Sequence, residues 1–211
     1  MIRTIPIGKG RDRFILSGGH ASLTQYVQLY FSGYGLTLDD LKNFRGGADT
    51  RTPGHPEYGL TPGIEMTTGP LGQGFASAIG FAYGQRFQRG LLDPEAPAGE
   101  SPFDHNIWVI CGEGDIEEGI SGEAASLAAN QQLGNLTVIF DANRIQIEGD
   151  TNLVLAEDVL KRFQAYAGTP TSSASSSLTA PTRRTSRVWP TPSPRLARPL
   201  RTSRSSSRSI P

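Results

Sequence analysis

The chain of 211 residues has a single cysteine, Cys111, no acidic residue after Asp158 and no long apolar run. One cysteine excludes an internal disulfide and fits a reducing compartment, and its expected role is to fill the core. No stretch approaches the ~20 apolar residues of a membrane-spanning helix, and residues 1–13 lack the apolar segment of a signal peptide. We therefore expect a soluble, cytoplasmic protein with no membrane partner.

The missing acids divide the chain into two parts. Residues 1–168 carry twelve basic and twenty acidic residues, a net charge of −8, whereas residues 169–211 carry eight arginines and no acid. The second part consists mostly of Ser, Thr, Pro and Arg, with too few apolar residues to offset the entropy of ordering it. We predict a folded domain over residues 1–168 and a disordered tail over residues 169–211.

The basic tail leaves a second kind of function open. An arginine block without acids attracts polyanions, so the chain could be a non-catalytic interaction protein that binds them through residues 183–208. Trp189 is the one aromatic residue there that could stack on bases, and no folded module frames the block. Nucleic acid is therefore not the expected partner.

The folded part has the pattern of an α/β domain, with apolar segments separated by Gly, Pro and Asp. Ile107–Cys111 and Leu136–Phe140 are short, apolar and rich in β-branched residues, which is typical of buried strands. Ser121–Leu133 is rich in Ala and Leu and precedes Gly134, which predicts a helix. Strand, helix and strand at this spacing form a parallel βαβ unit, so we expect a mostly parallel sheet flanked by helices.

Further helices precede this unit. Ser22–Phe31 is predicted to be a helix with Leu23, Val27 and Tyr30 facing the core.

Capping residues and residues that favour turns predict the bounds of the other segments. Thr37 and Asp40 form a variant capping box that opens a short helix through Phe44. Residues Thr67–Phe87 change from a glycine-rich turn into a helix of small residues, which permits close packing. Leu91–Pro102 is rich in Pro, Gly and acids and is predicted to be a surface loop.

A candidate metal site follows the two predicted strands. The run Gly112-Glu-Gly-Asp follows the first strand, and Asn143 follows the second. Ligands on parallel sheets collect at the carboxyl ends of the strands. A metal that bridges a diphosphate needs oxygen ligands, which Glu113, Asn143 and the carbonyl of Ile145 could supply, while Gly112 and Gly114 would let the backbone approach the phosphates. The local residues leave open an ordinary glycine turn and an ordinary Asp-x-Asn turn.

Two histidines lie in loops that are suited to rigid positioning. His55 lies in Thr52–Tyr58, and the glycine-rich segment Thr67–Gly74 follows closely. A lone histidine in a loop is more often structural than catalytic. His20 follows Leu-Ser-Gly-Gly and precedes a predicted helix, whose N-terminus could help it face an anion.

Together these segments resemble the N-terminal, thiamine-diphosphate-binding domain of transketolase, from about Arg11 to Tyr166. Each segment is weak evidence alone, but their uninterrupted order is specific. The His-Pro-Glu and Gly-Pro-Leu-Gly-Gln-Gly runs favour transketolase over other thiamine enzymes. The matching segments are Arg11–His20, Arg51–Tyr58, Thr67–Gly74, Gly112–Ser121, Glu123–Ala129, Leu133–Leu136 and Asp141–Ile145.

The resemblance implies roles for residues around the organic cofactor. His20 corresponds to a histidine near the cofactor diphosphate, and His55 to one that contacts the donor sugar; both are candidate catalytic residues. Gly69 and Leu71 match positions that line the aminopyrimidine ring, and Gly112 lies at the diphosphate.

The resemblance also implies a metal and a partner subunit. Glu113, Asn143 and Ile145 fall on the ligands of a divalent ion, Mg²⁺ or else Ca²⁺ or Mn²⁺. Glu118 falls on a glutamate that the family uses across the interface of a homodimer. The implied reaction moves a two-carbon ketol unit from a ketose phosphate to an aldose phosphate with thiamine diphosphate as cofactor.

Glu113 departs from the family, which generally has Asp there. One added methylene displaces the carboxylate, and small octahedral Mg²⁺ tolerates this poorly. We predict weakened cofactor affinity.

The resemblance also covers only part of the family's length. An early Gly-His-Pro segment is absent, and beyond Tyr166 the family continues into a second domain with the activating glutamate and the residues that bind substrate phosphate. We expect a chain that is inactive alone, unless a separate polypeptide completes the site. A further alternative is a chain that does not fold stably, because uncovered sheet edges remain.

The acid-free tail prompts a hypothesis about its origin, translation in a shifted reading frame. The other two frames beyond codon 167 test it, since failure to recover transketolase-like sequence there would refute it.

Overall fold

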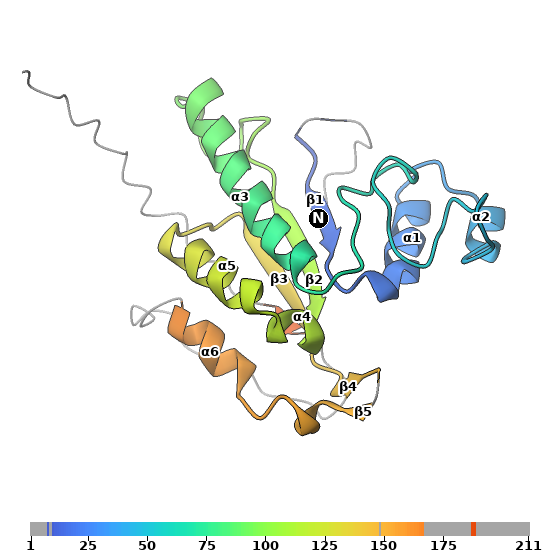
Figure 1. Cartoon of the computed structure of the whole chain (residues 1–211). Helices are drawn as coiled ribbons and strands as arrows, with labels where there is room; N and C mark the ends of the chain where they lie inside the picture. Colours follow the sequence, from blue (N-terminus) through green and yellow to red (C-terminus); the bar gives the residue numbers. More distant parts are fainter. Residues whose placement is uncertain (1–7, 9, 148, 167–186, 189–211) are drawn as a thin grey trace, which may run out of the picture.

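The central feature of the fold is a sheet whose first three strands are parallel (Figure 1). A computed structural model describes residues 8, 10–147, 149–166 and 187–188. The strands are β1 (Arg13–Leu16), β2 (Ile107–Gly112), β3 (Leu136–Asp141) and β6 (Arg187–Val188), in the spatial order β1-β2-β3-β6. Arg13 is in register with Ile107, which is in register with Leu136. The two predicted strands are confirmed, each one residue longer than expected.

The last strand lies in the part of the chain for which disorder is predicted. Arg187–Val188 pairs antiparallel with Ile139 and Phe140 of β3. An outer strand presents unpaired N–H and C=O groups, which any extended segment can satisfy. These two residues therefore depart from the predicted disorder, and the rest of residues 169–211 lies outside the described part of the chain.

The βαβ unit between β2 and β3 is confirmed, but its helix is divided. A short helix α4 (Glu113–Glu117) follows β2 directly, and α5 (Gly119–Asn130) follows after Glu118, whose extended backbone separates them. The predicted helix over residues 121–133 thus starts two residues early and ends three residues early. After β3, the chain forms the remaining short elements β4 (Ile145–Gln146), β5 (Gly149–Asp150), the 3-10 turn η2 (Thr151–Leu153) and the helix α6 (Val159–Tyr166).

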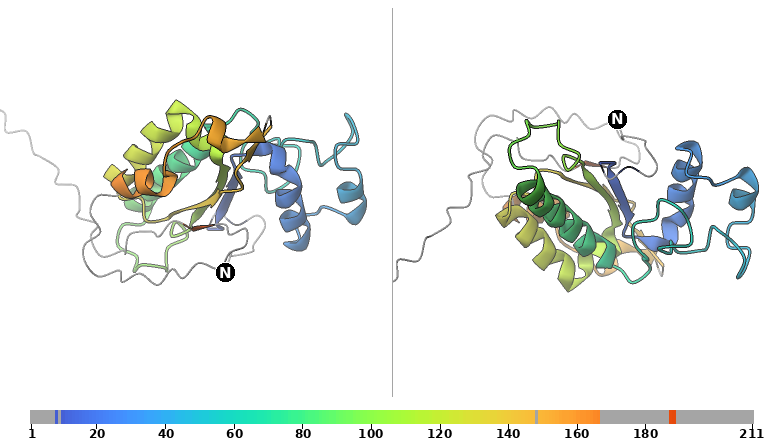
Figure 2. Two further views of the ribbon diagram at one scale, coloured as in Figure 1. Left: turned by 90° about the horizontal axis from the view of Figure 1, so that it is seen from below. Right: turned by 90° about the horizontal axis from the view of Figure 1, so that it is seen from above.

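Helices α3 (Gln73–Leu92), α5 and α6 lie on the same side of the sheet, whereas the segment before α3 lies beyond β1 (Figure 2). Apolar residues of β1 and β2 pack against α3 in the main core. The ring of Phe75 in α3 meets that of Phe163 in α6 edge to face, with 6.1 Å between their centroids. The fully buried members of this core include Ile15, Phe75, Ala78, Ile79, Ala82, Ile107, Val109, Cys111 and Ile116.

Helix α3 confirms the predicted turn followed by a helix of small residues. It begins after Gly72, whose φ of 77° lies in the left-handed region that glycine favours. A Cβ atom on Gly74 would lie only 2.5 Å from Cα of Ser17, so a glycine is needed where the helix crosses the end of β1. The helix continues through Leu92, so the predicted loop from Leu91 is wrong at its first two residues.

Helix α1 (Ser22–Phe31) has the predicted bounds, but its buried face differs from the prediction. The prediction is wrong for Leu23, which is 42% exposed, whereas Tyr30 packs against the cluster of Tyr26, Leu29, Leu36 and Ile64, as predicted. The residues buried on α1 are Ser22, Gln25, Tyr26 and Leu29. The hydroxyl of Ser22 donates to the carbonyl of Gly54 (2.8 Å), and that of Tyr26 to the carbonyl of Pro53 (3.0 Å). The hydrogen bonds between α1 and this loop therefore decide which face of α1 is buried, more than its apolar side chains do.

The short helix α2 (Leu38–Lys42) confirms the predicted capping box but ends two residues before the predicted end at Phe44. Thr37 Oγ1 accepts from the N–H of Asp40 (3.1 Å), while the N–H of Thr37 donates to the Asp40 carboxylate (2.7 Å). The Thr37 hydroxyl also donates to the Asp40 carboxylate (2.8 Å), and the bonds that this carboxylate accepts from the N–H and the hydroxyl of Thr37 are the main causes that lower the pKa of Asp40. A second, smaller core joins α1 to the loops around α2 and consists of Tyr26, Leu29, Leu36 and Ile64.

Within the described ranges, none of the helices has the length and apolar character needed to cross a bilayer.

Candidate functional site

The candidate site lies where the parallel strands end. The turn after β1 carries His20, the turn after β2 carries Gly112 and Glu113, and the loop after β3 carries Asn143. The register of the strands brings these ends to one edge of the sheet, because Gly112 is paired with Asp141. Sequence reasoning placed Glu113 and Asn143 at this edge, and both lie there in the structure, whereas β1, which carries His20 to the same edge, was not predicted.

Asp115 holds the glycine turn of this edge in place. Its side chain is 1% exposed, and one oxygen accepts from the Ser17 hydroxyl (2.6 Å) and from the N–H of Gly72 (2.8 Å). The other oxygen accepts from the N–H of Gly112 (3.0 Å). Sequence reasoning gave Asp115 no role. Its position in the Gly-Glu-Gly-Asp run was the available signal.

Glu113 is a buried carboxylate that lines a cavity. It is 5% exposed, and its Oε1 accepts from the backbone N–H of Arg144 (2.8 Å). The cavity has a volume of about 490 Å³ and is lined by Glu113, Phe140, Arg144 and residues of η2 and α6. Among the described residues, no ion pair includes Glu113. A buried carboxylate without a cationic partner is costly, so this site fits a bound cation.

Asn143 and Ile145 lie on an exposed loop that is ordered by local bonds. Asn143 Oδ1 accepts from the N–H of Ile145 (2.8 Å), and its amide donates to Asp141 (3.3 Å). Arg144, between them, has a φ of 63° in the left-handed region. The ordinary Asp-x-Asn turn is therefore present. The N–H of Arg144 donates to the Glu113 carboxylate and so links this turn to the end of β2.

The donor set of the candidate metal site consists of oxygen atoms. It combines the Glu113 carboxylate, the Asn143 amide oxygen and the Ile145 carbonyl, which suits a hard cation such as Mg²⁺, Ca²⁺ or Mn²⁺. In the described ranges, no three His, Cys, Asp or Glu side chains gather as a metal-binding group. The amide and the carbonyl are therefore essential to any ion bound here.

The two histidine loops meet at Gly19. A Cβ atom on Gly19 would lie 3.0 Å from Cδ2 of His55 and 3.0 Å from the nitrogen of Gly69. A Cβ atom on Gly69 would in turn lie 3.6 Å from Cδ2 of His55. The hydroxyls of Ser22 and Tyr26 in α1 donate to carbonyls of the loop around His55 and fix it. Burial raises the pKa of the Tyr26 hydroxyl to about 12. His55 and Gly69 thus lie side by side, with the imidazole of His55 exposed.

His20 lies in the turn after β1, and its ring and the Asp115 carboxylate both lie close to Gly18. A Cβ atom on Gly18 would be 3.3 Å from Cε1 of His20 and 3.5 Å from Oδ2 of Asp115. The His20 side chain is exposed, which leaves it accessible to a ligand at the strand ends.

Leu71 and Glu118 flank the glycine turn after β2. A Cβ atom on Gly114 would lie 2.9 Å from Cδ1 of Leu71, and one on Gly72 would lie 2.8 Å from Cβ of Glu118. Leu71 is 37% exposed, and Glu118 is also exposed. Leu71 therefore covers the backbone that the resemblance assigns to the diphosphate, and Glu118 is free to meet another surface.

Cys111 has no reactive role in this arrangement. Its side chain is fully buried, as predicted for core filling. Burial, followed by the charges of Asp115, Asp141 and Glu113, raises the pKa of the thiol well above its usual range. The thiolate is accordingly suppressed.

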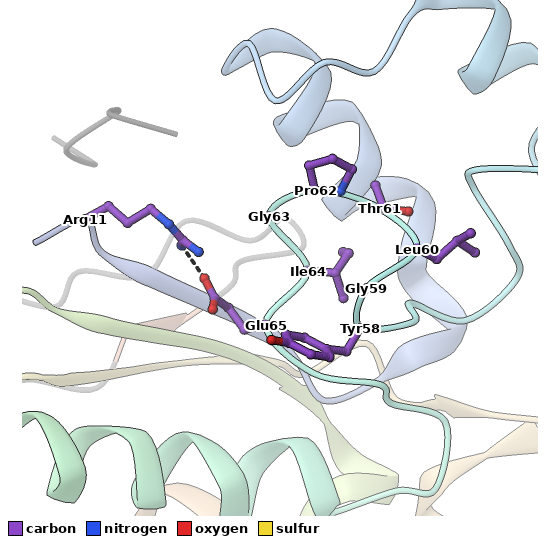
Figure 3. Close-up of a pocket in the computed structure, with 9 residues that line it drawn as sticks. All are labelled: Arg11, Tyr58, Gly59, Leu60, Thr61, Pro62, Gly63, Ile64 and Glu65. Atoms are coloured by element: carbon purple, nitrogen blue, oxygen red, sulfur yellow. Dashed lines mark ion pairs between the residues drawn. The ribbon is translucent and has the colours of Figure 1, made fainter. Parts of the chain in front are cut away.

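A second cavity lies away from the strand ends (Figure 3). Its volume is about 320 Å³, and Arg11 pairs with Glu65 across it. The loop that lines it, Tyr58–Glu65, connects the His55 segment to Gly69, but none of the predicted site residues lines the cavity. It offers no substitute for the site at the strand ends.

The fold and the site define the class: an α/β domain with a candidate diphosphate-and-metal site at the carboxyl ends of its strands. The family model "Transketolase, thiamine diphosphate binding domain" matches residues 6–176. The chain belongs to the transketolase family.

Relatives and solved structures agree with this assignment. The chain is 60% identical to a transketolase of Mycobacterium tuberculosis over 157 residues, which are 74% of this chain and 22% of the relative. It is 49% identical to that of Geobacillus stearothermophilus over 156 residues, 74% of this chain and 23% of the relative.

The structure of Campylobacter jejuni transketolase matches with a TM-score of 0.69 and 48% identity, over 77% of this chain and 24% of that one. The Leishmania mexicana transketolase matches with a TM-score of 0.71 and 44% identity, over 77% of this chain and 24% of that one. The chain thus spans about a quarter of the length of the relatives it matches.

Proposed function

We propose that this chain binds thiamine diphosphate together with a divalent cation at the carboxyl ends of β1, β2 and β3. Glu113, Asn143 and the carbonyl of Ile145 would hold the cation, and Gly112 and His20 would contact the diphosphate. The observation that carries the proposal is the buried Glu113 carboxylate, which lines a cavity and, among the described residues, accepts from one backbone donor. A divalent ion would offset that charge and that of an incoming diphosphate.

The remaining predicted residues extend the proposal to the rest of the ligand. Gly69 and Leu71, which lie beside His55 and the glycine turn, would line the aminopyrimidine ring. Bound thiamine diphosphate supplies the electron sink for moving a two-carbon ketol unit between sugar phosphates. The exposed His55 would hold a hydroxyl of the donor sugar, and His20 would donate to the diphosphate or accept a proton beside it.

We propose that this chain alone binds the cofactor without turning over substrate. It spans about a quarter of the relatives' length, so the rest of a transketolase active site would come from outside these 211 residues. Exposed Glu118, next to Gly72, is the predicted contact for a second copy or a separate completing chain.

Thermal unfolding of the full chain tests the binding proposal. Thiamine diphosphate with Mg²⁺, Ca²⁺ or Mn²⁺ should raise the midpoint, because a ligand that binds the folded state stabilises it by mass action. Thiamine without the diphosphate, and thiamine diphosphate with a chelator, should have little effect. Absence of a diphosphate-dependent shift with all three cations would contradict the proposal. Salt-sensitive binding of polyanions without such a shift would favour the interaction protein with a basic tail.

A further inference from the structure

We infer that Asp115 is a positioning residue, which joins the segments that carry the candidate site and sets their relative position before any ligand binds. The inference rests on four polar contacts that converge on one buried residue. It deepens the proposed function, on which its binding readout rests, but its structural readout is independent of any ligand.

Two of the contacts join parts of the chain that are far apart in sequence, and two are local. The Ser17 hydroxyl, at the end of β1, donates to the carboxylate at 2.6 Å across a separation of 98 residues. The N–H of Gly72 donates at 2.8 Å across 43 residues, and the N–H of Gly112 donates at 3.0 Å. The backbone carbonyl of Asp115 also accepts from the Ser121 hydroxyl in α5. One residue thus fixes four segments.

Ser17 extends this arrangement to the start of α3. Its oxygen accepts from the N–H of Phe75 at 2.8 Å while its hydroxyl hydrogen is donated to Asp115. That amide lies in the first turn of α3, where backbone donors have no partner within the helix. The pair of Asp115 and Ser17 therefore also anchors the beginning of the helix.

Each joined position lies within three residues of a predicted site residue in the sequence. Gly72 adjoins Leu71, and Gly112 adjoins Glu113. His20 lies three residues after Ser17, and Glu118 lies three residues before Ser121. A displacement of the Asp115 side chain would consequently move the ligand-facing segments together rather than one at a time.

The carboxylate is suited to this task because it only accepts hydrogen bonds. It uses both oxygens, and an amide of the same shape has one oxygen and an N–H₂ group. Asp115→Asn would place that N–H₂ group against at least one of the backbone N–H groups of Gly72 and Gly112. A buried donor that loses its acceptor is costly, so the turn would shift.

Asp12 provides a matched control on the opposite edge of the same sheet. It is 8% exposed and accepts from the N–H of Asn106 (2.8 Å) and from Nε1 of Trp108 (3.0 Å). Asp12 immediately precedes β1 and Asn106 immediately precedes β2, so this carboxylate joins the same two strands at their amino ends. Asp12→Asn should destabilise the fold in a comparable way without moving the candidate site.

The test measures amide hydrogen exchange and cofactor affinity in the full chain carrying Asp115→Asn or Asp12→Asn. In the Asp115→Asn variant, exchange should accelerate at least about tenfold in residues 69–76 and 110–118 together. Affinity for thiamine diphosphate with Mg²⁺ should fall about tenfold. The Asp12→Asn variant should leave both the exchange of these segments and the affinity within about twofold of the wild type.

Unchanged exchange of residues 69–76 and 110–118 in Asp115→Asn would overturn the inference. So would equal effects of the two substitutions, since Asp115 would then contribute general stability only. Should Asp115→Asn fail to fold, Ser17→Ala decides, because it removes one bond to Asp115 and the acceptor for Phe75 and should accelerate exchange in residues 69–76 where Asp12→Asn does not. A wild type that binds no cofactor contradicts the proposed function alone, and exchange then decides the inference.

Discussion

The two halves of the candidate metal site are built in different ways. At the end of β2, Glu113 and Asp115 are buried and bonded to distant parts of the chain. At the end of β3, Asn143 and Ile145 are exposed, and their bonds are local to the loop. The hydrogen bond from the Arg144 N–H to Glu113 joins the two halves.

This difference separates stability from binding. Changes in the buried half disturb bonds that hold the fold together, so they should affect both folding and ligand affinity. Changes in the exposed half break local bonds only, so they should weaken the cation site and leave the free energy of unfolding nearly unchanged. Each substitution below tests one side of this distinction.

The largest effect is expected for Glu113→Gln. Gln can still accept from the Arg144 N–H, so the substitution removes the charge and keeps the link between the halves. Affinity for thiamine diphosphate in the presence of Mg²⁺ should fall at least about 100-fold, the upper end of what changes in a metal's outer shell cost. Isothermal titration calorimetry measures this loss.

Glu117→Gln is the matched control, because Glu117 is an exposed carboxylate on the same helix α4. It should leave the affinity within about twofold of the wild type. Equal losses in the two variants would indicate a general effect of acidic charge and would remove Glu113 from the site.

The second largest effect is expected where α3 packs against Ser17, which is hydrogen-bonded to Asp115 in the buried half. A substitution there should lower the free energy of unfolding. Gly74→Ala would place a Cβ atom 2.5 Å from Cα of Ser17, and such overpacking typically costs ~1–3 kcal/mol. Gly80→Ala, on the same helix, meets no atom within 4 Å and should stabilise the chain by ~0.5–1 kcal/mol. Denaturant unfolding of both variants gives the comparison, and effects of the same sign would show that this crossing is not close-packed.

The fold was largely predictable because its signals are local. The β-branched runs at β2 and β3 and the capping box of Thr37 and Asp40 depend on residues close in sequence, and the structure confirms them. The buried face of α1 was not predictable. It depends on hydroxyl bonds from Ser22 and Tyr26 to carbonyls about 30 residues away, which apolar periodicity does not register.

The candidate site shows the same limit. Its location followed from two strand ends, and its candidate ligands followed from oxygen chemistry and from the resemblance. The role of Asp115 could not be predicted, because its donors come from residues 17 and 72 and depend on how α3 crosses β1. The bond from Arg144 to Glu113 likewise depends on the tertiary position of the β3 loop.

The third expected effect lies in the exposed half. Asn143→Ala removes a ligand oxygen and the acceptor for the N–H of Ile145. Affinity for thiamine diphosphate with Mg²⁺ should fall at least about tenfold, because loss of a direct ligand costs no less than an outer-shell change, and it should fall less than in Glu113→Gln because Asn143 carries no charge. The free energy of unfolding should change by less than about 0.5 kcal/mol. A loss of stability comparable to that of Gly74→Ala would contradict the contrast between the halves.

The smallest effect is expected for Glu113→Asp, which restores the residue usual in the family. The shorter side chain should suit Mg²⁺ better than Ca²⁺, because Mg²⁺ demands near-ideal octahedral geometry. The ratio of cofactor affinity with Mg²⁺ to that with Ca²⁺ should rise about threefold. Any cost of weakening the Arg144 bond cancels in this ratio. An unchanged ratio, with unchanged affinity for Mg²⁺, would show that the added methylene has no consequence.

The most direct measurement is a crystal structure of the full chain with thiamine diphosphate and Mn²⁺, in which anomalous scattering locates the ion. We expect one Mn²⁺ at the carboxyl ends of β2 and β3, bound by the Glu113 carboxylate, the Asn143 amide oxygen and the Ile145 carbonyl. An ion held elsewhere, or cofactor bound at the strand ends with no ion between Glu113 and Asn143, would contradict it.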